Sequence, residues 1–209
     1  MLILGSSSPT RANILKKHSI AFKQVGCDFD EDALQFAVPK DFVYHAAIGK
    51  MKACESCFGL ELPILCADTV VTAYGKILRK ARDEADALEL LKLQSGSDVA
   101  IITCMVYKSK SKMFIDLSQT LYRFAEFDEA DLKNYIESGE WRGKAGACMV
   151  EGFCKPYIRS IEGLESCAMG LTVEKLLRWI DDETSYLLSN PANSSQLLKR
   201  VKNIQKYMI

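Results

Sequence analysis

The sequence predicts an α/β fold in which a mixed β-sheet is flanked by helices. Strand-like and helix-like segments alternate along the chain, but without the regular rhythm of a purely parallel sheet. Residues 99–107 and 113–124 are two β-like runs with a short link, as expected of antiparallel neighbours. The chain has 209 residues, and at about 150 residues per domain this length suits one domain of two lobes.

The first residues predict a strand, a turn and a helix. Residues 2–4 are apolar, and three serines follow before Pro9 and a run of helix-forming residues. Ser8 is a suitable N-cap, and Pro9 suits the first position of a helix. A second strand is expected at residues 22–26.

The remaining elements follow from apolar periodicity and from residues that begin or end helices. Asp41, Asp83 and Asp128 are expected to cap helices, and Gly139 is expected to close the helix that Asp128 begins. Further strands are expected at residues 63–73, 77–78, 99–107, 113–124 and 157–161, with a helix at 173–180. Residues 1–180 are therefore expected to form a single domain of two lobes.

Residues 181–209 are expected to be a helical C-terminal extension. A loop rich in Ser, Asn and Pro precedes residues 196–209, whose apolar side chains have the spacing of one helix face. We expect this face to pack on its own chain rather than on a partner. Its inward residues are Leu197, Leu198, Val201, Ile204 and Met208.

The composition argues against several classes of protein. The 27 Lys and Arg residues equal the 27 Asp and Glu residues, so the chain lacks the basic footprint of a nucleic-acid-binding protein. The apolar runs are shorter than the ~20 residues of a membrane span, and no secretory signal pattern stands at the N-terminus. We therefore expect a cytoplasmic protein with no nucleic-acid partner and no membrane partner.

The cysteines and histidines limit the chemistry. The eight cysteines lie mostly among apolar residues and are expected to be buried thiols. Cys54 and Cys57 have Cys-x-x-Cys spacing, but no second pair completes a zinc site. His18 and His45 form no metal-binding pattern. Any catalysis would therefore depend on carboxylates, lysines, arginines and hydroxyl groups.

Two local patterns are candidates for a functional site. Residues 5–11, Gly-Ser-Ser-Ser-Pro-Thr-Arg, place hydroxyls and backbone N–H groups at a helix N-terminus, where a phosphate can bind and Arg11 can add a contact. Plain helix capping is the alternative interpretation. Asp68 interrupts an apolar run, and a buried carboxylate is costly unless it is paired or binds a cation. The alternative for Asp68 is a turn cap at a strand end.

Seven stretches then occur in a specific order between Leu2 and about Trp179. They are GSSSPTR, DFDE, AAIGK, ADTVV with GKILRK, LQSG, YIESGEWRGKAGACMVEG and IEGLESCAMGL. Their order and spacing resemble the Maf family of nucleoside triphosphate pyrophosphatases. The resemblance implies cleavage of nucleoside triphosphates, some of them modified, between the α and β phosphates, which yields the monophosphate and pyrophosphate. It also implies an elongated two-lobed fold like that of inosine triphosphatases, with a central cleft, and a homodimer.

The resemblance implies roles for individual residues. Asp68 and Glu31 are the implied catalytic residues, and both are implied ligands of a divalent cation, Mg²⁺ or Mn²⁺. The implied substrate-binding residues are Ser6, Ser8, Arg11, Lys50, Lys80, Lys144 and Glu151. These residue types suit the reaction, because cleavage of a phosphoanhydride needs cations to neutralise the phosphates and a carboxylate to position the attacking water.

The chain departs from the family pattern at several positions. Thr10 stands where a second arginine is usual, and Gly143 stands where an aspartate usually precedes the lysine. Lys80 lies in Leu-Arg-Lys-Ala, where Gly-Lys-Pro is usual. The family suggests nucleotide-pool housekeeping with a link to cell-division arrest. The departures leave an alternative, a catalytically weakened regulatory protein that binds nucleotides.

Glu151 leaves the preferred base open. Pyrimidine-specific members of the family carry glutamine here, whose amide both donates and accepts hydrogen bonds, whereas a carboxylate only accepts them. Glutamate followed by glycine suits a guanine edge and resembles the branch that prefers 7-methylguanosine triphosphate. Lys144 and ADTVV resemble the pyrimidine branch. A pyrimidine preference is expected if Glu151 turns away or pairs with a neighbouring lysine or arginine.

Overall fold

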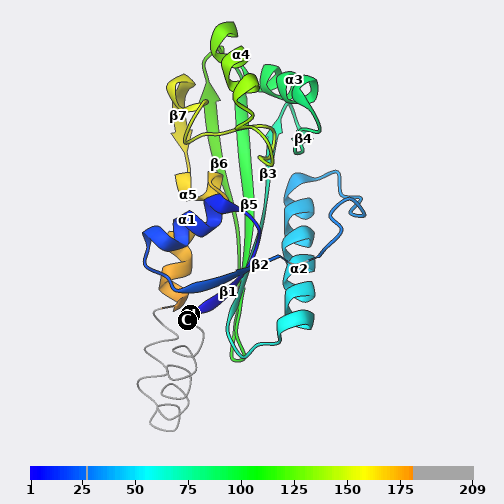
Figure 1. The fold of residues 1–209 in the computed structure, drawn as a ribbon, viewed down its shortest axis with the longest axis vertical. Helices are drawn as coiled ribbons and strands as arrows, with labels where there is room; N and C mark the ends of the chain where they lie inside the picture. Colours follow the sequence, from blue (N-terminus) through cyan, green and yellow to red (C-terminus); the bar gives the residue numbers. More distant parts are fainter. Residues whose placement is uncertain (27, 181–209) are drawn as a thin grey trace.

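The computed structural model describes residues 1–26 and 28–180, and this part of the chain is built on a seven-stranded mixed sheet (Figure 1). The strand order is β2-β1-β3-β5-β6-β7, and β4 pairs with β3. The strands are β1 (Leu2–Gly5), β2 (Phe22–Val25), β3 (Ile64–Ala73), β4 (Lys76–Leu78), β5 (Asp98–Lys108), β6 (Met113–Phe124) and β7 (Ile158–Glu162). Only β1 pairs in parallel, with β2 and β3. The predicted mixed sheet is confirmed.

Three long strands connect the two ends of an elongated molecule. All 10 residues of β3 pair with β5, and all 11 residues of β5 pair with β6. The helices are α1 (Pro9–Lys17), α2 (Pro39–Phe58), α3 (Glu84–Gln94), α4 (Glu129–Ser138), α5 (Glu165–Ala168) and the 3₁₀-helix η1 (Lys155–Tyr157). Figure 1 shows α1, α2, β1 and β2 around one half of the long strands, and α3, α4 and β7 around the other half. The expected two lobes are confirmed.

The helix caps follow the sequence prediction with one exception. Ser8, Asp83 and Asp128 each accept a backbone N–H in the first turn of α1, α3 and α4, and Gly139 ends α4 in a left-handed conformation. The prediction for Asp41 was wrong, because α2 begins earlier and Pro39 occupies its first turn, where a missing N–H costs nothing. The short helices α5 and η1 were not predicted, since three or four residues show no periodicity.

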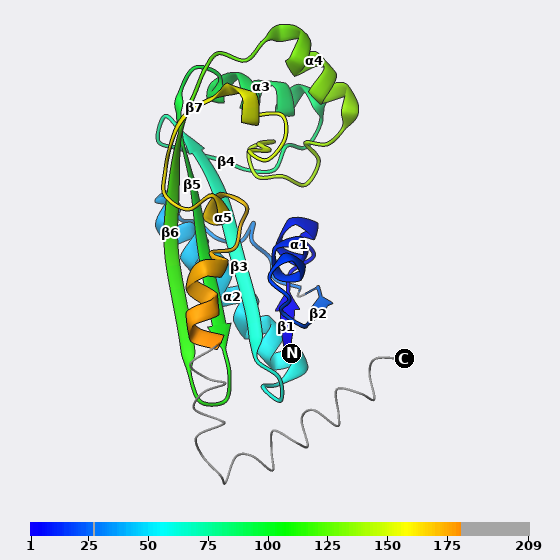
Figure 2. The same cartoon turned by 90° about the vertical axis from the view of Figure 1, so that its left-hand side faces the viewer.

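Helices cover both faces of the central strands, which explains the nearly continuous apolar runs there. Side chains of β3 alternate between the faces: Cys66 packs in a cluster with α2, whereas Leu65 and Ala67 pack with α1 and the helical residues 173–180. A third cluster fills the other lobe between the sheet, α3 and α4. Figure 2 shows α1, α3 and α4 on the same side of the sheet.

A buried carboxylate anchors the last described residues to β6. Asp116 accepts hydrogen bonds from the hydroxyls of Thr172 and Ser118, each at 2.7 Å, and from Lys175 Nζ at 2.6 Å. Burial alone would raise the pKa of Asp116, but the hydrogen bonds from Lys175, Ser118 and Thr172 outweigh it and lower the pKa. The predicted helix at residues 173–180 is confirmed. The predicted extension at residues 181–209 lies outside the described residues.

The cysteines match the expectation in part. Cys66, Cys104, Cys154 and Cys167 are buried free thiols, and burial raises the pKa of Cys66 to about 12. Cys54, by contrast, is disulfide-bonded, so the expectation of a thiol was wrong at this position. Apolar neighbours predict burial, but they do not distinguish a thiol from one half of a disulfide. No helix within residues 1–26 and 28–180 combines the length and apolar character of a membrane span.

Candidate active site

The candidate site lies at a gap along one edge of β3. On that edge, β1 pairs with Ile64 and Leu65 and β4 pairs with residues 71–73, so no described strand pairs with residues 66–70. Successive side chains of a strand point to opposite faces. Asp68 accordingly contacts α2, and Thr69 contacts α1. Because the edge is open, a ligand can reach side chains from both faces of the sheet at one place.

A cavity of about 1220 Å³ opens at this edge. Ligand pockets in proteins usually measure about 300–1,000 Å³, so a nucleotide fits here. The cavity is lined by the turn between β1 and α1, the loop between β2 and α2, the edge of β3, the segment after β4, and part of residues 140–151 in the other lobe. It contains every predicted site residue: Ser6, Ser8, Arg11, Glu31, Lys50, Asp68, Lys80, Lys144 and Glu151. The expected cleft between two lobes is confirmed.

Two carboxylates meet at one ammonium group in the cavity. Lys50 Nζ, from α2, lies 2.6 Å from Asp68 Oδ1 and 2.7 Å from Glu31 Oε1. The Asp68 side chain is only 7% exposed, so its negative charge requires this partner. Burial would raise the pKa of Glu31, but the charge of Lys50 and its hydrogen bond outweigh burial and lower the pKa. One cation faces two anions, so the cluster retains an excess of negative charge.

Arg11 is buried and joins three parts of the site. Its Nε donates to Gly170 O at 2.8 Å, Nη1 to Ser6 Oγ at 3.0 Å, and Nη2 to Thr69 Oγ1 at 2.9 Å. Burial lowers the pKa of the Arg11 guanidinium, while the negative charges of Asp68 and Glu31 act in the opposite direction. Arg11 therefore fixes residues 6–8 between β1 and α1, the serine turn, against β3, in addition to lining the cavity.

The other lobe contributes Lys144 and Glu151, whose Nζ and Oε1 atoms lie 3.5 Å apart. Gly146 places this segment against β3 and the residues after β4. It has a φ of +60°, and a Cβ atom there would lie 2.9 Å from Val71 Cβ, so only glycine fits. The N–H of Gly146 donates to the carbonyl of Arg79 at 3.0 Å. Lys144 is thereby positioned beside β3, the strand that carries Asp68.

Comparison with known proteins supports the resemblance read from the motifs. The model of the family described as Maf-like protein matches residues 1–183. The chain belongs to the Maf-like protein family. A protein from a Nitratiruptor species, named nucleoside triphosphate pyrophosphatase, is 56% identical over 178 residues, which cover 84% of this chain and 96% of the relative. A Helicobacter pylori (strain J99) protein of the same name is 41% identical over 176 residues, covering 84% and 93%.

A solved structure of the Staphylococcus aureus Ham1 protein also aligns with this Maf-like chain. The alignment has a TM-score of 0.44 and 11% sequence identity, and covers 59% of this chain and 71% of the Ham1 chain. The mixed sheet and the two lobes of the Maf-like protein are seen in its own structure and do not depend on this alignment.

The donor atoms of this Maf-like site suit a small divalent cation. Within residues 1–26 and 28–180, no three His, Cys, Asp or Glu side chains converge as a complete metal site. Mg²⁺, however, is commonly held by one or two carboxylates together with phosphate oxygens and water. Glu31 and Asp68 supply two carboxylates that lie close together, since each has an oxygen in contact with Lys50. The residues therefore fit a cation that completes its coordination with the phosphates of a substrate.

The structure adds a positioning contact that the motifs did not reveal. Gly49 lies in the middle of α2, and a Cβ atom there would lie 2.2 Å from ring carbons of Phe29. The Phe29 ring therefore occupies the space that any other residue at position 49 would fill. This packing holds the loop that carries Glu31 against the turn of α2 that carries Lys50. A glycine inside a predicted helix was the available signal, since glycine there weakens a helix.

Two more cavity residues were missed. Thr69, next to Asp68, accepts the hydrogen bond from Arg11, but a threonine in a strand is too ordinary to attract attention. Arg79 lines the cavity beside Lys80. Its signal in the sequence was the departure Leu-Arg-Lys-Ala, because an additional arginine stands directly before a predicted phosphate-binding lysine.

Proposed function

We propose that this Maf-like protein hydrolyses nucleoside triphosphates between the α and β phosphates, releasing the nucleoside monophosphate and pyrophosphate. One observation carries the proposal: the predicted phosphate-binding cations and the two predicted catalytic carboxylates, which are far apart in the sequence, line one cavity. The relatives at 56% and 41% identity, both named nucleoside triphosphate pyrophosphatase, support it.

The triphosphate binds between the serine turn and the lysines. The turn that includes Ser6 and Ser8 ends at the N-terminus of α1, where backbone N–H groups and the helix dipole favour an anion. Lys50, Lys80 and Lys144 line the same cavity and supply positive charge from α2, from the segment after β4 and from the other lobe. Arg11 holds this turn in place through Ser6.

Asp68 activates the attacking water in this proposal. One of its oxygens, Oδ1, contacts Lys50, and the carboxylate has a second oxygen that can accept a proton from water. The water oxygen forms a bond to phosphorus, the bridging P–O bond breaks, and pyrophosphate leaves with the electron pair of that bond. The lysines stabilise the negative charge on the leaving group. Lys50 also holds Asp68 in its orientation before the substrate binds.

Glu31 and Asp68 would hold Mg²⁺ or Mn²⁺, which would neutralise charge on the phosphates.

The proposed setting is the cytoplasm, where the protein acts as a homodimer in nucleotide-pool housekeeping, with a link to cell-division arrest. Size-exclusion chromatography with light scattering tests the homodimer.

The experiment is product analysis with the purified full-length protein. A panel of triphosphates is incubated with Mg²⁺, with Mn²⁺ or with a chelator, and the products are separated by ion-exchange chromatography. We expect the monophosphate and pyrophosphate, and a loss of turnover with the chelator. Diphosphate and orthophosphate products would contradict the proposed bond cleavage.

Asp68→Asn is the matched variant, since it preserves the shape of the side chain and removes the base. We expect turnover to fall by at least ~10²-fold, which is the lower end of a general-base contribution, with an unchanged circular dichroism spectrum. Near-normal turnover would refute the role of Asp68. If triphosphates raise the melting temperature of the wild-type protein but none is hydrolysed, the protein is instead a nucleotide-binding regulator.

A further inference from the structure

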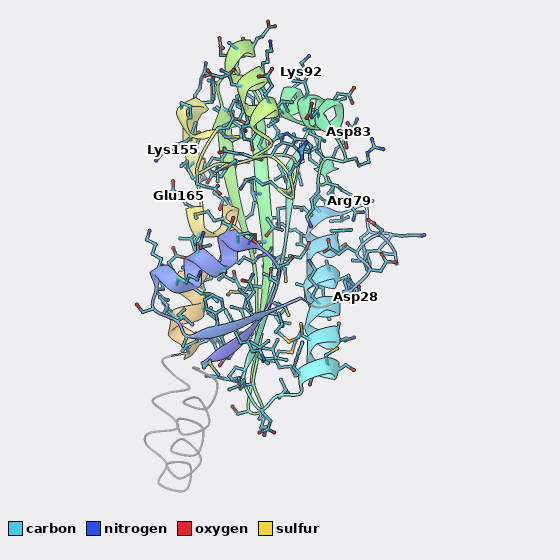
Figure 3. All side chains as sticks on the ribbon, in the orientation of Figure 1. Asp28, Arg79, Asp83, Lys92, Lys155 and Glu165 are labelled. Carbon is cyan, nitrogen blue, oxygen red and sulfur yellow. The ribbon has the colours of Figure 1, made fainter. Side chains whose placement is uncertain are left out.

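Arg79 lies at the edge of the cavity in a position from which it can reach a ligand. Its Nη2 atom is 2.7 Å from Asp32 Oδ1, and its guanidinium carbon lies 5.2 Å from the centre of the Phe42 ring. Figure 3 shows Arg79 near the N-terminal end of α2, on the side of the loop that joins β2 to α2. The side chain is 47% exposed, so it is neither buried in the core nor extended into solvent.

We propose that Arg79 is a substrate-binding residue of this protein, which exchanges the carboxylate of Asp32 for the phosphates of the triphosphate. This inference rests on the proposed function. Arg79 acts from the segment that follows β4, next to Lys80. Thr10, which also lines the cavity, is neutral. Arg79 therefore supplies the cavity with a guanidinium group that position 10 lacks.

The contacts of Arg79 suit such an exchange. The Asp32 side chain is 87% exposed, and ion pairs between exposed side chains contribute little to stability. A phosphate is a stronger partner, because a guanidinium group binds it through two parallel charge-assisted hydrogen bonds. Phe42 is buried, so its ring is a fixed surface on which the guanidinium group rests and remains oriented.

Arg79 also lies close to the proposed catalytic centre. Its ion-pair partner Asp32 directly follows Glu31 in the chain, and Arg79 lines the same cavity as Glu31 and Lys50. The backbone of Arg79 also lies close to Lys144, since the carbonyl of Arg79 accepts the N–H of Gly146, two residues after Lys144. A triphosphate bound by Lys80 and Lys144 is therefore within reach of Arg79.

The other arginines of the cavity are less available. Arg11 is buried and donates three hydrogen bonds to groups of the protein. Arg82 and Arg142 also form ion pairs, but with Asp86 and Glu84 of α3 rather than with the loop that carries Glu31. Lys50 is shared between two carboxylates, and Lys144 faces Glu151. A triphosphate carries several negative charges, so Arg79, whose partner Asp32 follows Glu31, is the arginine best placed to offset them.

Opposite effects of two substitutions test the proposal. Arg79→Ala removes the phosphate ligand and should raise KM for the triphosphate by about tenfold, with kcat changed by less than about threefold. Asp32→Ala removes the carboxylate that competes with phosphate and should leave KM unchanged or lower it. A purely structural ion pair would behave differently, because loss of either partner would have the same effect. Arg123→Ala is the control, since Arg123 also pairs with an exposed carboxylate, Asp98, but does not line the cavity.

A rescue adds a second test. Thr10→Arg, which places a guanidinium group at position 10, should recover at least half of the lost affinity in the Arg79→Ala background. Arg79→Lys should recover less, because an ammonium group cannot form two parallel hydrogen bonds. Equal increases of KM in Arg79→Ala and Asp32→Ala would overturn the proposal, as would an unchanged KM in Arg79→Ala.

Calorimetric titration with dTTP in the presence of a chelator separates this proposal from the proposed function. We expect a dissociation constant about tenfold higher for Arg79→Ala than for the wild-type protein. If the wild-type protein binds dTTP but does not hydrolyse it, the proposed function fails while this comparison still tests Arg79. If hydrolysis occurs and the two affinities agree, only the role of Arg79 fails. If no triphosphate binds to the wild-type protein, both proposals fail.

Discussion

Arg11 Nη2 donates a hydrogen bond to Thr69 Oγ1 at 2.9 Å, which connects the serine turn to the strand residue beside Asp68. The chain of hydrogen bonds continues in one direction. Thr103 donates its hydroxyl proton to Cys167 O at 2.7 Å, so in the 2.9 Å contact between the two threonines Thr69 is the donor. A buried arginine, two threonines and a carbonyl group of α5 therefore connect α1, β3, β5 and α5 beside the cavity.

Thr69→Val should destabilise the protein while preserving the shape of the side chain. The change leaves an N–H group of buried Arg11 without its acceptor, and such a loss costs about 1–3 kcal/mol. Urea unfolding measures the free energy directly. Thr72→Val is the control, because Thr72 lies in the same strand and donates one hydrogen bond, to Ala100 O at 3.2 Å. Equal destabilisation by the two variants would show that the Arg11 network adds nothing.

Stability should depend on pH through Glu31. Burial opposes ionisation of this carboxylate, but Lys50, Lys80 and Arg79 lower its pKa below the ordinary value of 4.5. The folded state therefore binds this proton less readily than the unfolded chain. The stabilisation is fully present above about pH 4.5, and it is lost as the pH falls through the lowered pKa of the folded state.

Denaturant unfolding of the wild-type protein and Glu31→Gln between about pH 3 and pH 7 measures this contribution. We expect the difference in stability to be largest at neutral pH and to shrink in acid. Lys50→Met removes the cation that contributes most to lowering the pKa of Glu31. The stability of this variant should therefore depend less on pH than that of the wild-type protein, as for Glu31→Gln. A stability difference that stays constant across this pH range would contradict the assignment.

Elements with a local cause could be predicted from the sequence. Ser8, Asp83 and Asp128 cap helices because each supplies an oxygen to a nearby backbone N–H group, which a short stretch of sequence reveals. The start of α2 was placed too late because Asp41 is an equally good cap by this criterion, whereas Val38 occupies the position without a side-chain hydrogen bond.

Residues of the candidate site could be predicted only where they belong to one of the family motifs. The lysines and carboxylates were found because their order resembles a family pattern, and the cavity brings them together. Thr69, Phe29 and Arg79 were missed because their contacts join segments far apart in the chain. The unpaired edge of β3 at residues 66–70 could not be predicted either, because it depends on how far β1 and β4 extend along β3.

Gly49→Ala should separate stability from activity. Alanine is favoured over glycine in a helix by about 1 kcal/mol, which offsets part of the cost of displacing the Phe29 ring, so the melting temperature should change little. The added Cβ atom would nevertheless lie 2.2 Å from the Phe29 ring, so the ring and the loop with Glu31 must move away from Lys50. We expect turnover at limiting Mg²⁺ to fall by about tenfold if Glu31 holds the cation.

The double variant Gly49→Ala, Phe29→Ala is the matched control for this prediction. It removes the ring that the new methyl group displaces, so part of the lost turnover should return. Unchanged turnover in Gly49→Ala alone would show that the position of the loop does not matter for catalysis.

The preferred base of the substrate should be a pyrimidine. Glu151 Oε1 lies 3.5 Å from Lys144 Nζ, so the structure has the pairing with a neighbouring lysine under which a pyrimidine preference is expected. The ammonium charge offsets the carboxylate, which would otherwise repel the carbonyl oxygens of thymine and uracil. The wild-type protein should therefore have a higher kcat/KM for dTTP and UTP than for GTP and 7-methyl-GTP.

Two variants test whether the pairing decides the preference. Glu151→Gln should keep the order of substrates, since glutamine both donates and accepts hydrogen bonds and so suits a pyrimidine. Lys144→Met leaves the carboxylate without its cation, so it is free to accept N–H groups of guanine. Lower activity is expected overall, but the ratio of kcat/KM for GTP over dTTP should rise by about tenfold, the lower end of discrimination by a single contact. A wild-type preference for guanine substrates that Glu151→Gln reverses would mean that the carboxylate binds the base directly, and that Lys144 does not keep it from doing so.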